Sequence, residues 1–283
     1  MPSTLTPLRY PGGKTKYTEM FSEIILVNRL QMCTFVEVFA GGAGAAIKLL
    51  LSKQVKSIFI NDLDVNIYAF RRTLKEQPKE LIDLIRKTPI TTEEWDRQKR
   101  IYSIKDTTNM LSLGFSTFFL NRCNHSGILQ ANPIGGKNQT GNHKIDARYH
   151  KGNLIKKIED IANHKDSIEV FNLDALDLLK HLKNKYRNRE LLIYLDPPYV
   201  QKGPLLYLNH YQLEDHRKLR NDTLNSPFSW ILSYDSHDSV IDLYKGNKCK
   251  IYRNNLRHTI SGNKTAEELI ISHLKVPSYL KAV

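Results

Sequence analysis

The sequence predicts an α/β fold with a doubly wound, mostly parallel sheet, and two observations support this prediction. Short apolar segments rich in strand-forming residues alternate with segments of helical pattern up to about residue 74, and again from about residue 166. Such alternation is typical of strand–helix–strand units. It lapses in between, over residues 75–165. We therefore expect a sheet domain formed by residues 1–74 and 166–283, with residues 75–165 as an inserted second domain.

The first part of the sheet domain contains two predicted strands, each followed by a predicted helix. The strands are FVEVF (35–39) and SIFIND (57–62), and the helices are AGAAIKLLLSK (43–53) and VNIYAFRRTLK (65–75). β-Branched and aromatic residues favour strands, whereas Ala, Leu and amphipathic spacing favour helices. This order is the one expected for neighbouring parallel strands.

The inserted segment is helical at first and polar afterwards. Its helical stretches cover residues 80–87, 92–104 and 113–122. The residues that follow, up to about 153, are dense in Gly, Asn, Lys and His, which makes them too long and too polar for a connection inside an α/β core. We expect a mainly helical surface lobe that carries a long loop or a β-hairpin.

The last part of the chain returns to the sheet pattern. A strand near residues 168–172 precedes a helix, and the apolar segment ELLIYLDPPY (190–199) is a buried strand that ends in a Pro-Pro turn. Two further strands are expected at SWILSYD (229–235) and AEELIISHL (266–274). The carboxyl ends of such strands form the edge at which open α/β sheets bind ligands.

The charge balance is strongly basic. The 283 residues include 42 Lys and Arg against 29 Asp and Glu, a net charge of +13, and residues 245–264 hold six basic residues and no acid. This favours a partner with a phosphate backbone, although a merely soluble basic protein is the alternative.

Metal, disulfide and membrane classes are not indicated by the sequence. The three cysteines are scattered, the ten histidines lack metal-ligand spacing, and neither a signal segment nor an apolar run of about 18 residues occurs. We expect a cytoplasmic protein without a metal.

A glycine-rich turn follows the first predicted strand. Phe39-Ala40-Gly41-Gly42-Ala43-Gly44 closes the strand and opens a helix, and Asp62 ends the next strand. Glycines there let the backbone approach a nucleotide-like ligand, and an acid at the end of the next strand can accept hydrogen bonds from ribose hydroxyls. An ordinary tight strand–helix turn is the alternative for this motif taken alone.

The second motif, Asp196-Pro197-Pro198-Tyr199, ends the apolar strand of residues 190–199. An Asp carboxylate beside the Pro197 carbonyl forms a paired acceptor for an amino group, and the Tyr199 ring offers a stacking face for a flat base. Two acceptors that draw on the hydrogens of a conjugated amine would localise its lone pair. A Pro-Pro strand stop with a surface tyrosine is the alternative.

A third motif, Arg9-Tyr10-Pro11-Gly12-Gly13-Lys14, precedes these two. In this order, from Leu8 to about Asp238, the three motifs resemble the Dam-type (α-class) adenine-N6 DNA methyltransferases. The resemblance implies a Rossmann-like methyltransferase sheet and S-adenosyl-L-methionine as the methyl donor. It also implies transfer of the methyl group to N6 of an adenine flipped out of a short duplex DNA sequence.

The resemblance carries over to individual positions. For Asp174, the alternative to a cofactor contact is a helix N-cap. The segment Ser233–Asp238 either lines the base pocket or forms a solvated loop. The cofactor positions implied by the resemblance are Tyr10, Lys14, Phe39, Gly41, Asp62, Asp174 and Asp196. The catalytic positions are Asp196, Pro197, Pro198 and Tyr199.

The resemblance also assigns the polar part of the lobe to DNA recognition. The DNA-binding candidates are Asn121, Arg122, Asn124, Gln130, Lys137 and Arg148. Enzymes of this type that recognise GATC usually have an arginine where this chain has Gln130. Because arginine pairs with guanine whereas glutamine prefers adenine, we expect a target other than GATC.

Several alternatives stay open at the level of sequence. Related methyltransferases act on cytosine N4, RNA adenine or protein amides, and a non-catalytic DNA-binding module would keep the basic lobe. The expected partner is double-stranded DNA, which implies a nucleoid-associated protein. Both a cognate restriction endonuclease and a solitary methylase are compatible with the sequence.

Overall fold

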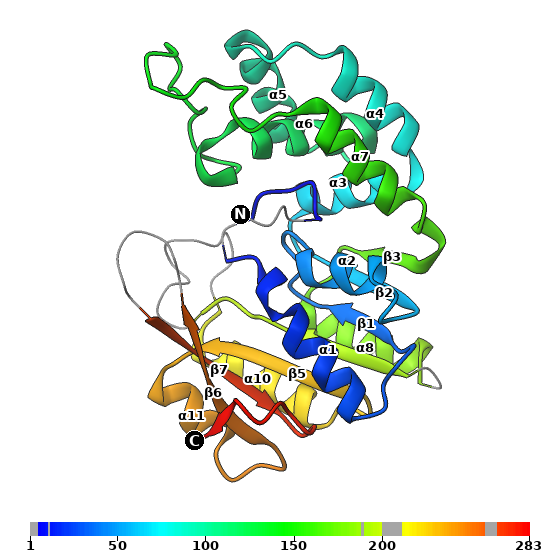
Figure 1. Cartoon of the computed structure of the whole chain (residues 1–283), viewed down its shortest axis with the longest axis vertical. Helices are drawn as coiled ribbons and strands as arrows, with labels where there is room; N and C mark the ends of the chain where they lie inside the picture. Colours follow the sequence, from blue (N-terminus) through cyan, green and yellow to red (C-terminus); the bar gives the residue numbers. More distant parts are fainter. Residues whose placement is uncertain (1–4, 11, 188–189, 200–210, 258–264) are drawn as a thin grey trace. The chain divides into compact units, whose positions relative to one another are not determined.

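The computed structural model describes residues 5–10, 12–187, 190–199, 211–257 and 265–283 (Figure 1). Its sheet has eight strands in the order β3-β2-β1-β4-β5-β7-β6-β8. The pairs β2–β3, β1–β4 and β4–β5 are parallel, whereas β5–β7, β6–β7 and β6–β8 are antiparallel. The strands are β1 (Thr34–Glu37), β2 (Ser57–Asn61), β3 (Ile168–Phe171), β4 (Leu191–Leu195), β5 (Ser229–Asp235), β6 (Lys250–Arg257), β7 (Thr265–Ser272) and β8 (Lys281–Ala282). The predicted fold class is confirmed.

The chain divides into two compact units. The first comprises residues 1–18, 40–54 and 58–172, and the second comprises residues 19–39, 55–57 and 173–283. This division follows compactness and is not a test of function. The functional division into a catalytic and a recognition domain therefore stays a prediction.

In the first unit, a group of helices forms the inserted lobe (Figure 1). Close packing of α3 on α6 holds the lobe together. A side chain at Gly114 of α6 would lie 2.7 Å from the Ala69 carbonyl oxygen, and Thr73 Oγ1 donates a hydrogen bond to the Met110 carbonyl at 2.8 Å. The helices of this unit are η1 (Lys14–Tyr17), α2 (Gly44–Leu51), α3 (Val65–Glu76), α4 (Pro78–Lys87), α5 (Thr92–Ile104), α6 (Met110–Cys123), η2 (His125–Gly127), α7 (Lys151–Ala162) and η3 (Lys165–Ser167).

A loop rather than a hairpin connects α6 to α7. Over residues 124–150, all of which are described, strand pairing is limited to one isolated bridge between Asn124 and Pro133. Turns and bends occupy most of the remaining positions. Of the two forms expected for this segment, the long loop is therefore the one observed.

In the second unit, the core lies around the central strand β4. All five residues of β4 are buried, and the Tyr194 ring lies 4.7 Å from that of Phe21 and 6.3 Å from that of Phe35. The helices of this unit are α1 (Thr18–Val27), α8 (Ala175–Lys185), α10 (Leu213–Leu224) and α11 (Asp238–Tyr244). Across the described ranges, no helix combines the length and apolar character needed to span a membrane.

Candidate active site

The glycine turn before α2 is held by hydrogen bonds to the side chains of Asp62 and Arg71. The Gly41 N–H donates to Asp62 Oδ2 at 2.9 Å, and Arg71 Nη2 donates to the Gly41 carbonyl at 3.0 Å. Gly41 has a φ of +44° and Ala43 a φ of +47°. Left-handed residues are costly for any amino acid except glycine, so the structure around this turn enforces its shape.

The N-terminal motif lies against the same turn. A Cβ atom at Gly41 would lie 2.5 Å from the Tyr10 ring, and one at Gly42 would lie 2.8 Å from Tyr10 Cβ. Lys14 is buried, with its Nζ 5.2 Å from the centroid of the Tyr17 ring. The structure thus brings together three predicted cofactor residues of the first unit, namely Tyr10, Gly41 and Asp62, and buries the fourth, Lys14, beside Tyr17.

Asp62 also organises the chain that follows it. Its Oδ1 accepts from the Asp64 N–H at 2.9 Å, and Asn172 Nδ2 donates to the carbonyls of Asp62 and Leu63 at 2.8 and 3.0 Å. Burial raises the pKa of Asp62 to about 6, although the N–H groups of Asp64 and Gly41 and the charge of Arg71 oppose the rise. Each carboxylate oxygen has two lone pairs, so both can accept a ligand hydroxyl as well.

The Asp-Pro-Pro-Tyr motif of the second unit begins where β4 ends. Ser233 Oγ, from β5, donates to Asp196 Oδ1 at 2.7 Å. Tyr199 Oη donates to Glu268 Oε1, on β7, at 3.2 Å. Pro197 and Pro198 are buried, whereas Asp196 and Tyr199 are half-buried. Both functional ends of the motif are therefore hydrogen-bonded to side chains of other strands, β5 and β7.

Phe39 and Asp174, two predicted cofactor residues of the second unit, both lie near the Tyr211 ring. The Phe39 ring meets the Tyr211 ring edge-on, with centroids 5.9 Å apart. Burial, followed by the charge of Asp174, raises the pKa of Tyr211 above its ordinary range. Asp174 itself caps α8, because its Oδ1 accepts from the Leu176 N–H at 2.9 Å. The capping role is observed, and the role of Asp174 toward the cofactor stays a prediction.

Two predicted DNA-binding residues lie inside the lobe. Asn121 and Asn124 are fully buried. Asn121 bonds the backbone N–H and carbonyl of Arg9, each at 2.7 Å, and the Gly127 carbonyl at 2.8 Å. Asn124 accepts from Trp95 Nε1 at 2.6 Å and donates to the carbonyls of Ile128 and Leu129, each at 3.0 Å. Both side chains hold the loop in shape.

Four basic side chains gather beside this loop, those of Arg9, Arg122, Arg148 and Lys157. Arg122 Nε donates to the Arg148 carbonyl at 2.9 Å, and Arg9 Nη1 donates to the Asn124 carbonyl at 3.0 Å. Burial and then the charge of Arg9 lower the pKa of Arg122 to about 10, and burial followed by Arg122 lowers the pKa of Lys157. Within the described ranges, no acid forms an ion pair with any of the four. This unneutralised group is suited to an anion.

The other two DNA-binding candidates are exposed. Gln130 lies on the outside of the loop. Lys137 is 3.8 Å from Asp96 Oδ1, and its Nζ lies 5.7 Å from the centroid of the Trp95 ring. The basic segment of residues 245–264 is covered only in part, since residues 258–264 lie outside the described ranges, as does Pro11.

Several charged residues of this region were not predicted from the sequence. Arg71, Glu37 and Glu268 are charged yet at least nine-tenths buried. Glu37 and Glu268 each interrupt an apolar strand, and Arg71 lies on the buried face of α3. A charge at a position where periodicity demands an apolar residue was the available signal.

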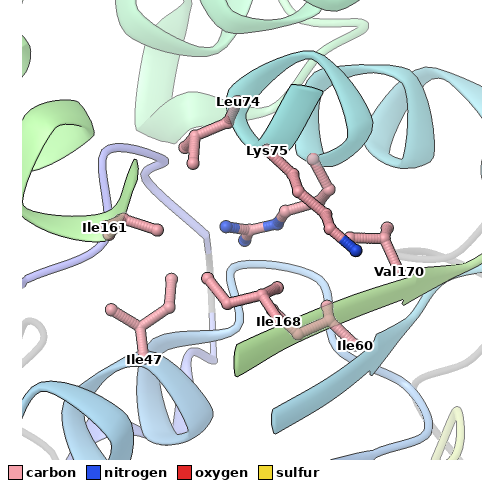
Figure 2. Close-up of a pocket in the computed structure, with 8 residues that line it drawn as sticks. Ile47, Ile60, Leu74, Lys75, Ile161, Ile168 and Val170 are labelled. Carbon is pink, nitrogen blue, oxygen red and sulfur yellow. The ribbon is translucent and has the colours of Figure 1, made fainter. Parts of the chain in front are cut away.

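The first unit also encloses a small apolar pocket (Figure 2). It holds no more than about one water molecule, and none of the predicted site residues lines it. Its lining residues are Ile47, Ile60, Arg71, Leu74, Lys75, Ile161, Ile168 and Val170. We interpret it as a gap in packing rather than a ligand site.

The class of the protein is decided by comparison with known families. Residues 10–260 match the model of the D12 class N6 adenine-specific DNA methyltransferases. The chain belongs to this family. It is therefore a site-specific, adenine-N6 DNA methyltransferase, and the family uses S-adenosylmethionine as methyl donor. In the described part of the chain, no group of three or more His, Cys, Asp or Glu residues is placed to hold a metal ion.

Two curated proteins are similar at low identity. The chain is 22% identical over 205 residues to type II methyltransferase M.MjaIII of Methanocaldococcus jannaschii, covering 68% of each chain. It is 24% identical over 212 residues to modification methylase StsI of Streptococcus sanguinis, covering 69% of this chain and 28% of that methylase.

Proposed function

We propose that Asp196, Pro197 and Tyr199 form the acceptor site for the adenine that this methyltransferase modifies. The observation that carries the proposal is the position of the Asp196 carboxylate. It follows the end of β4 directly, and Ser233 holds one of its oxygens at 2.7 Å. A carboxylate fixed at this edge can accept from the amino group of a base that has left the duplex.

The chemistry asked of these residues is positional and electrostatic. The N6 lone pair of adenine is delocalised into the ring, so the amine is a weak nucleophile. Acceptance of its two hydrogens by the Asp196 carboxylate and the Pro197 carbonyl localises that lone pair, while the Tyr199 ring stacks on the base. S-adenosylmethionine supplies an electrophilic methyl group on a sulfonium. Asp196 acts chiefly as an acceptor, and the N6 proton passes to solvent.

The cofactor residues form two sets, one in each unit. In the first unit, Asp62 accepts the ribose hydroxyls, Gly41 lets the backbone approach, and Tyr10 and Lys14 contact the cofactor. The close approach at Gly41 supports this fit, because any side chain there would meet the Tyr10 ring. In the second unit, the proposed set is Phe39, Asp174 and Asp196.

The lobe residues divide into two roles toward DNA. Arg9, Arg122 and Arg148 bind backbone phosphates, because they form a cationic group without an acidic partner in the described ranges. The exposed Gln130 and Lys137 are the candidates for base contacts, and a glutamine favours adenine over guanine. We therefore propose a target other than GATC. Asn121 and Asn124 act by holding the loop.

The biological setting follows from the relatives. One similar protein is named a type II methyltransferase and the other a modification methylase, names that support a role in restriction–modification. We propose a cytoplasmic, nucleoid-associated enzyme whose cognate endonuclease is a functional rather than a physical partner. A solitary methylase is the alternative.

A labelled-methyl assay tests the acceptor site. The wild-type protein, Asp196→Ala and the matched control Asp222→Ala, at an exposed acid of α10, are incubated with duplex DNA and with RNA, and the nucleosides are then analysed. We expect N6-methyladenine in DNA from the wild type and the control, and a loss of at least about 100-fold in Asp196→Ala. N4-methylcytosine, or label only in RNA, would contradict the proposal.

A further inference from the structure

Three side chains of β4 and β5 point to the same side of the sheet beneath the catalytic motif. Tyr194 pairs in parallel register with Ile231, and Asp196 and Ser233 each lie two residues further along. Because side chains alternate along a strand, residues two apart share a face. Tyr194 and Ser233 are 1% and 0% exposed. The register therefore places the buried Ser233 side chain beside Asp196 on the neighbouring strand, and the buried Tyr194 side chain two residues before Asp196 on the same face.

The three groups are joined by two short hydrogen bonds. Ser233 Oγ lies 2.7 Å from Asp196 Oδ1, and Tyr194 Oη lies 2.7 Å from Ser233 Oγ. A serine hydroxyl has one proton, and an ionised carboxylate can only accept. Once Ser233 donates to Asp196, Tyr194 must therefore be the donor to Ser233. The direction is fixed from tyrosine to serine to carboxylate.

A chain of donors that ends on a carboxylate has two effects. Each bond polarises the next, which strengthens the last one, and hydrogen bonds to a charged group are stronger than neutral ones. Since Ser233 holds Oδ1 from the neighbouring strand, the plane of the carboxylate is set, and with it the direction from which an amino N–H approaches. A carboxylate that rotated would lose this alignment.

We propose that Ser233 is a positioning residue for Asp196, and that Tyr194 supports it through the Ser233 hydroxyl. This inference rests on the proposed role of Asp196 as the acceptor of adenine N6. It assigns a function to a strand position outside the Asp-Pro-Pro-Tyr motif. It also predicts that the two hydroxyls act as one unit rather than independently.

The first test is a series at position 233 with a matched control. Ser233→Ala removes the donor, whereas Ser233→Cys fills nearly the same space with a weaker donor. The control is Ser272→Ala, because Ser272 is equally buried and its hydroxyl bonds main-chain groups: it donates to the Trp230 carbonyl at 2.6 Å and accepts from the Leu274 N–H at 3.1 Å. The full-length enzyme is assayed for kcat, KM for DNA and Kd for S-adenosylmethionine, and its folding is checked by thermal melting.

We expect kcat to fall about 10- to 100-fold in Ser233→Ala and by an intermediate factor in Ser233→Cys. KM and Kd should stay within about twofold, and Ser272→Ala should keep the wild-type kcat. A role in packing alone predicts full activity for Ser233→Cys, so that result would overturn the inference. A loss confined to KM or Kd would overturn it as well.

The second test is a double-mutant cycle with Tyr194→Phe, which keeps the ring and removes the hydroxyl. We expect this variant to lose a few-fold in kcat on its own and almost nothing further in the Ser233→Ala background. Full additivity of the two losses would contradict the chain of donors. A wild-type enzyme that methylates no DNA would overturn the proposed function itself, whereas an active wild type with unaffected variants would overturn only this inference.

Discussion

At the scale of single residues, Asp62 shows how far a motif can be predicted and where prediction ends. Its place at the end of β2, across from the glycine turn, follows from strand–helix alternation in the sequence. Its raised pKa does not, because it depends on burial that only the folded chain creates. The Arg71 contact with the same turn was missed for the same reason, since it joins residues 30 positions apart.

The pKa of Asp62, about 6, predicts a pH dependence of cofactor binding. An ionised Asp62 accepts ribose hydroxyls, so the affinity for S-adenosylmethionine should fall as the pH drops through about 6. Isothermal titration calorimetry between about pH 5 and 8 measures this, with Asp62→Asn as the variant that should bind weakly at every pH. A wild-type affinity that stays constant across this range would contradict the role of Asp62.

The effect of Asp62 on stability changes with pH in the direction opposite to its effect on cofactor binding. Its pKa in the folded protein lies above the ordinary value of about 3.9. Between these two values the folded state holds the proton more tightly than the unfolded chain. The contribution of this group to the free energy of unfolding therefore decreases as the pH rises from about 4 to 6. Weaker cofactor binding at low pH is thus not explained by Asp62-driven unfolding.

Gly41→Ala tests the glycine turn. The new Cβ would lie 2.5 Å from the Tyr10 ring at a φ of +44°, so we expect a loss of about 1–3 kcal/mol in the free energy of unfolding and at least about tenfold weaker cofactor binding. The control is Gly152→Ala on α7, where a Cβ meets nothing within 4 Å; it should be neutral or stabilising. Denaturant titration and calorimetry measure both quantities, and equal behaviour of the two variants would rule out this account of the turn.

At the scale of elements, local sequence patterns predicted several helices and strands closely. The helix over residues 92–104 and the strand over 229–235 coincide with α5 and β5. The strand β6 was missed because its sequence, KIYRNNLR, is basic and lacks a clear apolar alternation. Pairing with β7 on one side and β8 on the other makes it a strand. Sheet pairing of this kind is tertiary and leaves little trace in local sequence.

The loop between α6 and α7 (residues 124–150) is a second case, in which side-chain hydrogen bonds decide the form. Asn124 bonds two backbone carbonyls and the Trp95 ring N–H, and local side-chain bonds of this sort compete with strand pairing. For this reason the segment forms a braced loop rather than a hairpin. Sequence alone left both forms open.

Asn124→Ala should loosen this loop without touching the cofactor site. The loss of three hydrogen bonds in a buried place should cost about 2–4 kcal/mol of stability and weaken binding to target DNA, while the Kd for S-adenosylmethionine stays unchanged. Thermal melting, fluorescence anisotropy with labelled duplex and calorimetry check the three quantities. Asn153→Ala, at an exposed position of α7, is the matched control. Unaltered DNA binding in a destabilised Asn124→Ala protein would show that the loop does not contact DNA.

At the scale of the whole molecule, the charge of +13 and the family agree on a polyanionic substrate. The glycine turn and the Asp-Pro-Pro-Tyr motif were predictable because they lie at strand ends that alternation marks. The polar network of Tyr194, Ser233 and Asp196 was not, because it needs the register of β4 on β5. Functional residues outside motifs are therefore found only when the sheet is assembled.

The cationic group of Arg9, Arg122, Arg148 and Lys157, beside the loop between α6 and α7, predicts a salt effect. If Arg148 neutralises one phosphate, Arg148→Ala should reduce the slope of log affinity against log salt by about 1, and weaken binding equally for target and non-target DNA. Lys53→Ala, at an exposed site after α2, should leave the slope unchanged. Anisotropy titrations between about 50 and 300 mM salt measure it. A change in sequence preference instead of slope would mean that Arg148 contacts a base.

The most direct test of the central claim is a methylation map. The wild-type chain and Asp196→Ala are expressed in a host that lacks adenine methylation, and the host genome is sequenced with modification-sensitive single-molecule reads. We expect N6-methyladenine at one short motif other than GATC in the wild type, and none in the variant. Soluble, folded wild-type protein that leaves every adenine unmodified, or equal methylation by both proteins, would contradict it.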